Sequence, residues 1–222
     1  MGHYRLHHDP KSSHQRIARL VRGWKRSPVL DVGAAQGFLG QLLCNSGLEI
    51  DAIEPHPEWA QNARPFYRTI FASTVEDAPL EKNSYRVVVC ADVLEHVQFP
   101  NRVLDSLGET STPDALFVVS VPNVAHGAVR LMLLFGFFPK MERGVLDKTH
   151  LHFWTLDTAR QLLQNAGLEV LVSYPTGVPI DELWRGSPKV GRVLMRLQHV
   201  ALRIAPRFFA HQWVLVARKT AR

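Results

Sequence analysis

The chain has 222 residues, of which 46% are hydrophobic and 21% are charged. This composition is that of an ordinary globular protein, so it excludes the disordered, collagen-like and low-complexity classes. The two cysteines, Cys44 and Cys90, lie in apolar runs, and we expect both to be buried and reduced. No apolar run reaches about 18 residues, and the polar N-terminus does not have the apolar core of a signal peptide, so we expect a cytoplasmic protein.

The formal net charge of +6 is distributed unevenly along the chain. Residues 1–28 carry seven Lys or Arg and one acid, residues 29–182 carry ten against nineteen acids, and residues 183–222 carry nine and no acid. An acidic middle is not typical of a nucleic-acid-binding domain, and we expect no nucleic-acid partner. The basic ends either keep the protein in solution or contact phosphate on RNA, lipid or an activated sugar.

Short, β-branched apolar runs alternate with amphipathic stretches along the middle of the chain. The runs are continuous, which is typical of strands buried on both faces of a parallel sheet. The predicted strands cover residues 28–32, 49–54, a short segment before 73, 86–90, 115–121, 168–174 and 212–219. The predicted helices between them cover residues 38–46, 57–64, 100–110 and 157–166. This alternation predicts one α/β domain over residues 1–222, with a doubly wound sheet.

Two segments extend this core. Residues 1–28 form an N-terminal helical extension, with a predicted helix over 14–22. Residues 186–206 predict a basic amphipathic helix, whose apolar positions are Val190, Val193, Leu194, Leu197, Ala201 and Ile204 and whose cations are Lys189, Arg192, Arg196 and Arg203. Such a helix either packs on its own domain, beside the final strand, or makes weak contact with an anionic membrane.

The strongest local motif is PVLDVGAAQGFLG over residues 28–40. A buried strand ends after Asp31, a small-residue turn follows, and a helix begins near Phe38. The glycines allow close approach of a ligand, and the helix N-terminus offers free N–H groups, so we expect a cofactor site there. The dinucleotide fingerprint requires glycine at 33, 35 and 38, where this chain has Gly, Ala and Phe, which disfavours a nicotinamide oxidoreductase.

An acid two residues before the first glycine, with another glycine four residues later, resembles motif I of the S-adenosylmethionine-dependent methyltransferases. Further segments agree in order: Glu54 after the second strand, residues 73–79, CADVLEH over 90–96, SVPN over 120–123 and DKTHLH over 147–152, with residues 9–14 and 208–213 at the two ends. The chain resembles the ubiquinone-type branch and, more closely, the methyltransferases found beside glycosyltransferases in bacterial polysaccharide and natural-product pathways.

This resemblance implies a Rossmann-like, doubly wound α/β sheet of seven strands, with the last strand antiparallel and helices on both faces. It implies S-adenosylmethionine as cofactor and S-adenosylhomocysteine as product. The implied cofactor-binding residues are Asp31, Gly33, Ala34, Ala35, Gln36, Gly37, Glu54, Pro55, Thr74, Val75, Glu76, Cys90, Ala91 and Asp92. Asp31 could instead only orient the turn, and Asp92 and Glu95 could only cap and solvate the following helix.

Two positions depart from the family pattern. Ala35 stands where the family most often has a glycine, and a turn that stays near the αR or β region would accept it. Thr74 stands where an acid often meets the adenine, so Glu76, Asp77 or backbone groups would serve. These departures leave open a non-catalytic module that binds S-adenosylmethionine.

For the acceptor, the resemblance favours a hydroxyl, with an amine second, on a small molecule or a glycan sugar; RNA or protein is the alternative. A hydroxyl needs a base, and histidine titrates near neutral pH, so the candidates are His150, then His126, with Asp92 near the methyl end. A purely structural His150 is equally compatible. No His-x-x-x-His or Cys-x-x-Cys pair occurs, and we expect no metal. Residues 124–153 form an acceptor-side insertion whose apolar part is either a lid or a core helix.

Overall fold

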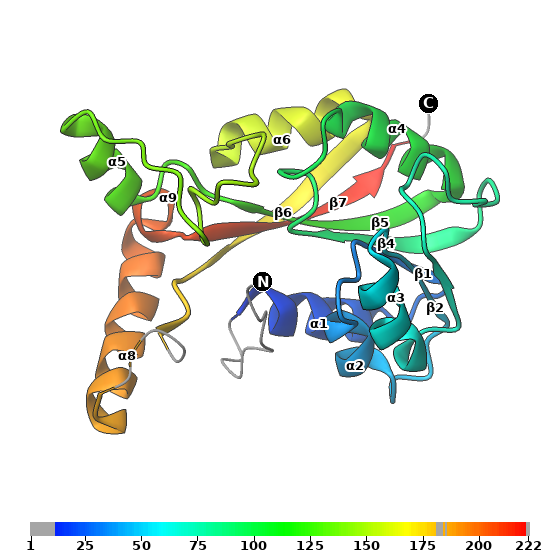
Figure 1. The fold of residues 1–222 in the computed structure, drawn as a ribbon, viewed down its shortest axis with the longest axis horizontal. Coiled ribbons are helices and arrows are strands. Elements are labelled where there is room, and N and C mark those ends of the chain that lie inside the picture. Colours follow the sequence, from blue (N-terminus) through cyan, green and yellow to red (C-terminus); the bar gives the residue numbers. More distant parts are fainter. Residues whose placement is uncertain (1–11, 181–183, 185, 221–222) are drawn as a thin grey trace.

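The structure is a computed structural model that describes residues 12–180, 184 and 186–220. Part of the predicted extension 1–28, and of the segment 9–14, therefore lies outside the described residues. Seven strands form one sheet in the order β3-β2-β1-β4-β5-β7-β6 (Figure 1). Their bounds are β1 Val29–Val32, β2 Ile50–Ile53, β3 Thr69–Phe71, β4 Tyr85–Ala91, β5 Ser111–Pro122, β6 Leu168–Thr176 and β7 Gln212–Lys219.

The sheet direction confirms the predicted fold class. Strands β1 to β5 pair in parallel, whereas β7 runs antiparallel to both β5 and β6. The predicted strand ends agree with the structure within a few residues, and β7 agrees at both ends. The long β5 begins four residues earlier than predicted, because Ser111 already pairs with Tyr85 before a shift in register.

Helices cover both faces of the sheet. One face packs on α1 Ser13–Trp24 and α2 Phe38–Leu43 through a core that includes Ile17, Val21, Leu39, Val89 and Val118. The opposite face packs on α4 Pro100–Thr110 and α6 Leu156–Asn165 (Figure 1). Helix α3 covers Pro57–Ala63, followed by the short 3-10 helix η1 Arg64–Phe66. Remaining helices are α5 Gly127–Leu134, α8 Pro188–Ile204 and α9 Pro206–Phe209.

The parallel register brings several strand ends to one edge of the sheet. Val32 at the end of β1 lies between Ile53 of β2 and Cys90 of β4. Ala91 pairs with Ser120, so the residues after β4 lie beside the end of β5. Loops that are distant in sequence therefore meet at this carboxyl edge, where ligands bind in open α/β sheets.

One sequence expectation is wrong, and two of the alternatives left open do not hold. Cys44 is exposed rather than buried, because it lies just beyond the end of the short helix α2; Cys90 is buried as expected. Helix α8 does not cover the sheet beside β7: Leu202 is its one buried residue, and it extends away from the layers (Figure 1). Helix α5 is not a core helix either, since Val129 is its one buried residue. Within the described part of the chain, none of the helices has the length and apolar character needed to span a membrane.

Candidate active site

The turn after β1 has the backbone geometry of a tight ligand-binding loop. Gly33 and Gly37 have φ angles of 72° and 85°, in the left-handed region where glycine carries no steric penalty. Ala35 also lies there, with φ 48°, so the turn does not have the αR or β conformation that would accept an alanine without strain. The hydrogen bond from Gly37 N–H to Ala34 C=O, at 2.8 Å, closes the turn around Ala35 and accounts for its strained conformation.

Close packing also explains the first glycine of the loop. A Cβ atom at Gly33 would lie 2.6 Å from Cγ2 of Val93, in the segment after β4. The loop after β1 and the segment after β4 are therefore in direct contact. Gln36 is exposed at the tip of the turn and Ala34 is buried beneath it.

The carboxyl of Asp31 is buried beneath this loop. It accepts a hydrogen bond of 2.5 Å from the Tyr67 hydroxyl, which accepts the Gly40 N–H at 3.0 Å. Burial raises the pKa of Asp31 from 3.8 to about 7; the Tyr67 hydrogen bond opposes this rise and the charge of Glu54 adds to it. Asp31 therefore contacts the first turn of α2 through the Tyr67 hydroxyl. This contact is compatible with a second role, in which the carboxylate binds a cationic group of the cofactor.

Glu54, directly after β2, holds the other side of the loop. Its carboxylate oxygens accept hydrogen bonds from Ala35 N–H at 2.7 Å and from its neighbour His56 N–H at 2.8 Å. The side chain is buried, with 4% exposure. The next residue, Pro55, is exposed. Each carboxylate oxygen has further acceptor capacity, so Glu54 can bind a hydroxyl pair as well as the loop.

The other predicted cofactor-binding residues surround the same edge. Thr74 and Glu76 are exposed beyond β3, and the Thr74 hydroxyl donates to Asp77 at 2.9 Å, while Val75 between them is buried. Burial raises the pKa of the Cys90 thiol, which excludes a reactive thiolate there. Its neighbour Ala91 ends β4 and is half-buried.

These features fit S-adenosylmethionine. A buried carboxyl with a pKa near neutrality, Asp31, can stabilise the cofactor's ammonium group. A buried acid at the end of β2, Glu54, suits two ribose hydroxyls. Most N–H groups of the loop already donate to Ile53, Glu54 or Ala34, which leaves the exposed tip at Gln36 to receive a carboxylate. The sequence therefore supplies groups for both ends of this cofactor.

Asp92 occupies the end of β4 in a constrained conformation. Its φ angle is 58°, an unfavourable region for a residue with a Cβ. Its carboxylate accepts hydrogen bonds from the Ser120 hydroxyl, at 2.8 Å, and from the Gln212 amide. These bonds from β5 and β7 fix the carboxylate at the carboxyl edge.

Glu95 contradicts the expectation that it is solvated on a helix. It is fully buried in the turn before α4, and neither carboxylate oxygen has a hydrogen-bond partner among the described residues. Burial, and next the charge of Asp92, raise the pKa of Glu95 well above its ordinary value. The carboxyl is thus held protonated unless a cation or a donor reaches it.

His96 and His150 lie against Glu95. Their rings are 4.9 Å apart in an edge-to-face arrangement, and one ligand atom from each of the three residues falls within 4.8 Å of the others. Two imidazoles and one carboxylate can hold a divalent metal ion, so the structure provides a possible donor set that the sequence spacing did not indicate.

The two candidate bases occupy the same region. His150 Nδ1 lies 3.1 Å from the Val145 carbonyl, and burial, the largest effect, lowers the pKa of His150. His126 caps α5, where its Nδ1 accepts the Ala128 N–H at 3.2 Å, and burial lowers its pKa too. Its ring packs edge-to-face on His211, whose pKa burial lowers to about 4. All three imidazoles are therefore neutral near pH 7.

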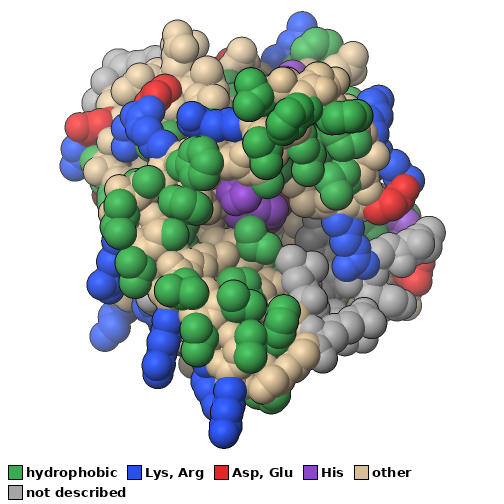
Figure 2. Space-filling view, turned by 90° about the vertical axis from the view of Figure 1, so that its left-hand side faces the viewer, with side chains coloured by type: hydrophobic (Ala, Val, Ile, Leu, Met, Phe, Trp, Pro, Cys, Tyr) green, Lys and Arg blue, Asp and Glu red, His purple; other side chains and the backbone are tan. Residues whose placement is uncertain are grey.

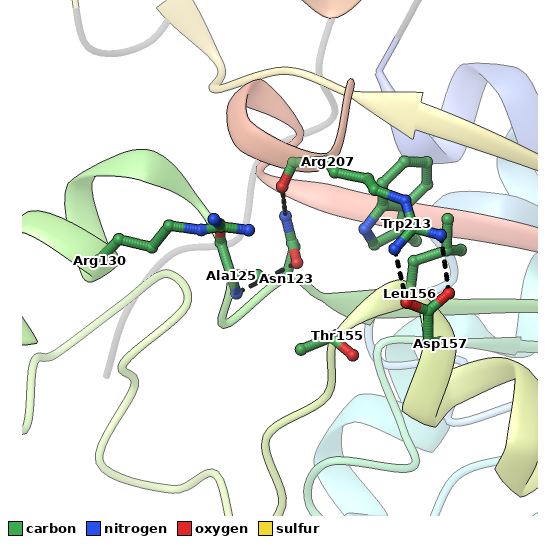
Figure 3. Close-up of a pocket in the computed structure, with 8 residues that line it drawn as sticks. All are labelled: Asn123, Ala125, Arg130, Thr155, Leu156, Asp157, Arg207 and Trp213. Carbon is green, nitrogen blue, oxygen red and sulfur yellow. Dashed lines mark hydrogen bonds and ion pairs between the residues drawn. The ribbon is translucent and has the colours of Figure 1, made fainter. Parts of the chain in front are cut away.

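A small cavity of about 140 Å³ lies on the β7 side of this region (Figure 3). Asn123, directly after β5, and the Arg207–Asp157 ion pair line it, together with Trp213. The buried Trp213 Nε1 has no hydrogen-bond partner among the described residues. None of residues 31–37 lines the cavity, so it is separate from the loop after β1.

Four residues of this edge were not predicted as site residues: Tyr67, Ser120, His211 and Gln212. Tyr67 is 36 residues from Asp31, and Gln212 is 120 residues from Asp92. No local pattern marks such pairs. The FFAHQW segment over 208–213 was included in the family resemblance, and it contains both His211 and Gln212.

Comparison with known proteins agrees with this geometry. A sequence model of the family described as "Methyltransferase domain" matches residues 4–173. The "Ubiquinone biosynthesis O-methyltransferase" of Xanthomonas euvesicatoria is 28% identical over 155 residues, which cover 64% of this chain and 62% of that protein. The chain thus spans less than two thirds of that relative.

Solved structures share the fold at low identity. A SAM-dependent methyltransferase from Archaeoglobus fulgidus superposes with a TM-score of 0.64, at 15% identity, over 93% of this chain and 95% of that one. The 1,6-didemethyltoxoflavin-N1-methyltransferase of Burkholderia thailandensis was solved with S-adenosylhomocysteine. It superposes with a TM-score of 0.62, at 18% identity, over 95% of this chain and 80% of that one. The chain belongs to the S-adenosylmethionine-dependent methyltransferase family, and S-adenosylmethionine is its cofactor.

Proposed function

We propose that this chain methylates a hydroxyl group of a small molecule or of a glycan sugar, with an amine as the second candidate acceptor. In this proposal Glu54 binds the ribose hydroxyls, and residues 33–37 with Asp31 hold the methionine end. Residues 74–76 meet the adenine, and residues 90–92 lie beside the methionine.

The observation that carries the proposal is the state of His150. A carbonyl oxygen can only accept a hydrogen bond, so the contact with Val145 places the proton of the neutral ring on Nδ1. Nε2 is then left with a free lone pair, and the lowered pKa keeps it unprotonated at neutral pH. A hydroxyl acceptor requires such a base.

The bound cofactor supplies an electrophilic methyl group on a positively charged sulfur. When a hydroxyl acceptor takes that methyl group, leaving a neutral thioether, His150 Nε2 would receive the hydroxyl proton. The fixed carboxylate of Asp92 stabilises the resulting imidazolium through space, since its charge already raises the pKa of His150 slightly against the effect of burial. His126 is the second candidate for the proton, although Ala128 already occupies its Nδ1.

The names of the relatives support oxygen as the acceptor atom only at 28% identity. The test is transfer of a deuterated methyl group from S-adenosylmethionine to three acceptor pools, read by mass spectrometry: sugar nucleotides, their amino-sugar counterparts, and bulk RNA. We expect label on hydroxyl acceptors, and its loss in His150→Asn. Label on RNA alone would contradict the proposal and favour the macromolecular alternative.

A further inference from the structure

The exposed hydrophobic side chains of this protein are concentrated on one side. Among the described residues, all the large ones except Phe99 and Leu171 belong to three neighbouring parts: α5 with the loop that follows it, residues 151–153, and the α8–α9 region with Trp184. The most exposed are Leu134 at 77% and Ile204 at 78%. Monomeric proteins rarely expose large continuous apolar surface without a binding partner for it.

Helix α8 has the pattern of a helix at a membrane surface. Val193, Leu197, Val200 and Ile204 are exposed along it, at 52%, 61%, 51% and 78%. Lys189, Arg192, Arg196 and Arg203 are exposed on the same helix. Helix α8 thus has an apolar stripe beside cations, and it does not pack on the sheet. Such a helix suits the boundary between lipid headgroups and acyl chains.

The α5 region continues this surface. Arg130 of α5 lies over the Phe208 ring of α9, 5.7 Å from its centroid, and a Cβ at Gly127 would lie 2.3 Å from Phe208. Helices α5 and α9 are therefore in direct contact, and α9 follows α8. Viewed from this side, apolar side chains lie above and below a group of histidine side chains, with Lys and Arg at the margins (Figure 2).

We propose that residues 131–141, α8 and α9, together the docking face, bind the surface of an anionic lipid bilayer. Charge selects this occupant: residues 183–222 contain no acid, and residues 124–146 contain three cations and Glu142, which pairs with Lys148. A second copy packed across a two-fold axis would bring the α8 cations against one another. A neutral apolar partner would leave those cations without counter-charge.

This face also defines the acceptor class, and that extension rests on the proposed function. His126 caps α5, and His150 packs on Phe153, whose ring packs on Phe138 of the docking face. An acceptor group carried on a lipid would therefore reach both histidines from the membrane side. The chain would then methylate an acceptor that stays anchored in the bilayer.

The test is sedimentation of the full chain with phosphatidylcholine vesicles, with and without phosphatidylglycerol. We expect binding to the anionic vesicles that is lost at about 0.5 M NaCl, because salt screens exposed charges. Each cation near such a surface contributes about 1 kcal/mol, so Arg192→Gln with Arg196→Gln should weaken binding about thirtyfold. Leu134→Ser with Phe135→Ser should weaken it at least about tenfold.

Matched controls remove the same groups elsewhere. Arg86→Gln with Arg102→Gln, and Phe99→Ser with Leu171→Ser, change exposed residues outside the docking face and should leave vesicle binding unchanged. Calorimetric binding of S-adenosylhomocysteine reports folding of every variant. Because no acceptor is present, vesicle binding is measured independently of the proposed function. Absence of binding at low salt, or equal loss in the control variants, would overturn the proposal.

Discussion

The Tyr67 hydroxyl donates a 2.5 Å hydrogen bond to the buried Asp31 carboxyl and accepts the Gly40 N–H. A single phenol thus connects the end of β1 with the first turn of α2, which carry the two sides of the cofactor loop. Burial and the nearby Asp31 raise the pKa of the Tyr67 hydroxyl, so it remains a donor at all relevant pH values.

Asp31→Asn should change how stability depends on pH. The folded protein raises the pKa of Asp31 from 3.8 to about 7, so the folded state holds this proton more tightly than the unfolded state. The free energy of unfolding of the wild type should therefore fall, relative to that of Asp31→Asn, as pH rises from about 4 to about 7, by roughly 4 kcal/mol. Urea unfolding of both proteins across this range measures the difference. Parallel curves would contradict the raised pKa.

Tyr67→Phe removes the hydrogen bond without changing the shape of the ring. The ionised Asp31 then loses its donor in a buried site, which costs about 1–3 kcal/mol. We expect the loss of stability to be larger at pH 8 than at pH 5, because Asp31 is protonated at the lower pH. Tyr174→Phe, on β6, is the matched control. A loss independent of pH would place the effect in packing instead.

The sheet was predictable from the sequence because buried parallel strands are continuous apolar runs between turn residues. The loop over 33–37 was recognised from its glycines. The φ angle of Ala35 was not predicted, because its N–H is held by Glu54, which is 19 residues away in the sequence. Glu95 shows the limit most clearly. Its burial depends on the segment after β5, whose Leu151 N–H donates to the Glu95 carbonyl at 2.8 Å.

Helix α8 was predicted at nearly the observed bounds, whereas its environment was not. The apolar stripe from Val190 to Ile204 indicates an amphipathic helix. The same stripe could pack either on the sheet of its own domain or on a lipid surface. Tertiary contacts decide between them, and they place one residue, Leu202, in the core.

Ala35→Gly should relieve backbone strain in the loop. Ala35 has φ 48°, where a Cβ costs about 1–2 kcal/mol, while the extra freedom of glycine in the unfolded chain offsets about 0.4–1 kcal/mol. We expect a slightly higher free energy of unfolding and unchanged or tighter cofactor binding. The neighbouring Ala34→Gly, which removes a buried methyl group outside the left-handed region, should destabilise the protein. The same loss in both variants would contradict the strain at Ala35.

Glu54→Ala should weaken binding of S-adenosylmethionine about tenfold to a hundredfold. The change removes an acceptor for the ribose and for the Ala35 N–H, and losing a hydrogen bond to a charged group costs about 1.5–3 kcal/mol. Isothermal titration calorimetry measures the dissociation constant. Glu58→Ala, an exposed acid in α3, is the control and should bind as wild type. An unchanged constant in Glu54→Ala would remove Glu54 from the site.

His150→Asn should lower turnover while cofactor affinity stays near that of the wild type. A general base contributes about 10²–10⁴-fold, and the loss should shrink as pH rises if hydroxide can replace the imidazole. His152→Asn is a matched control two residues along, since His152 contacts a different carbonyl: its Nε2 lies 3.3 Å from that of Gln98. Intact turnover in His150→Asn would show that a group other than His150 takes the hydroxyl proton.

The most direct test of the account is a crystal structure of the full chain with S-adenosylhomocysteine. We predict both ribose hydroxyls within hydrogen-bond distance of Glu54, the amino-acid end against residues 33–37, and the sulfur atom directed toward Asp92 and His150. Density for the ligand elsewhere, or with its sulfur turned away from His150, would contradict the proposed site and its chemistry.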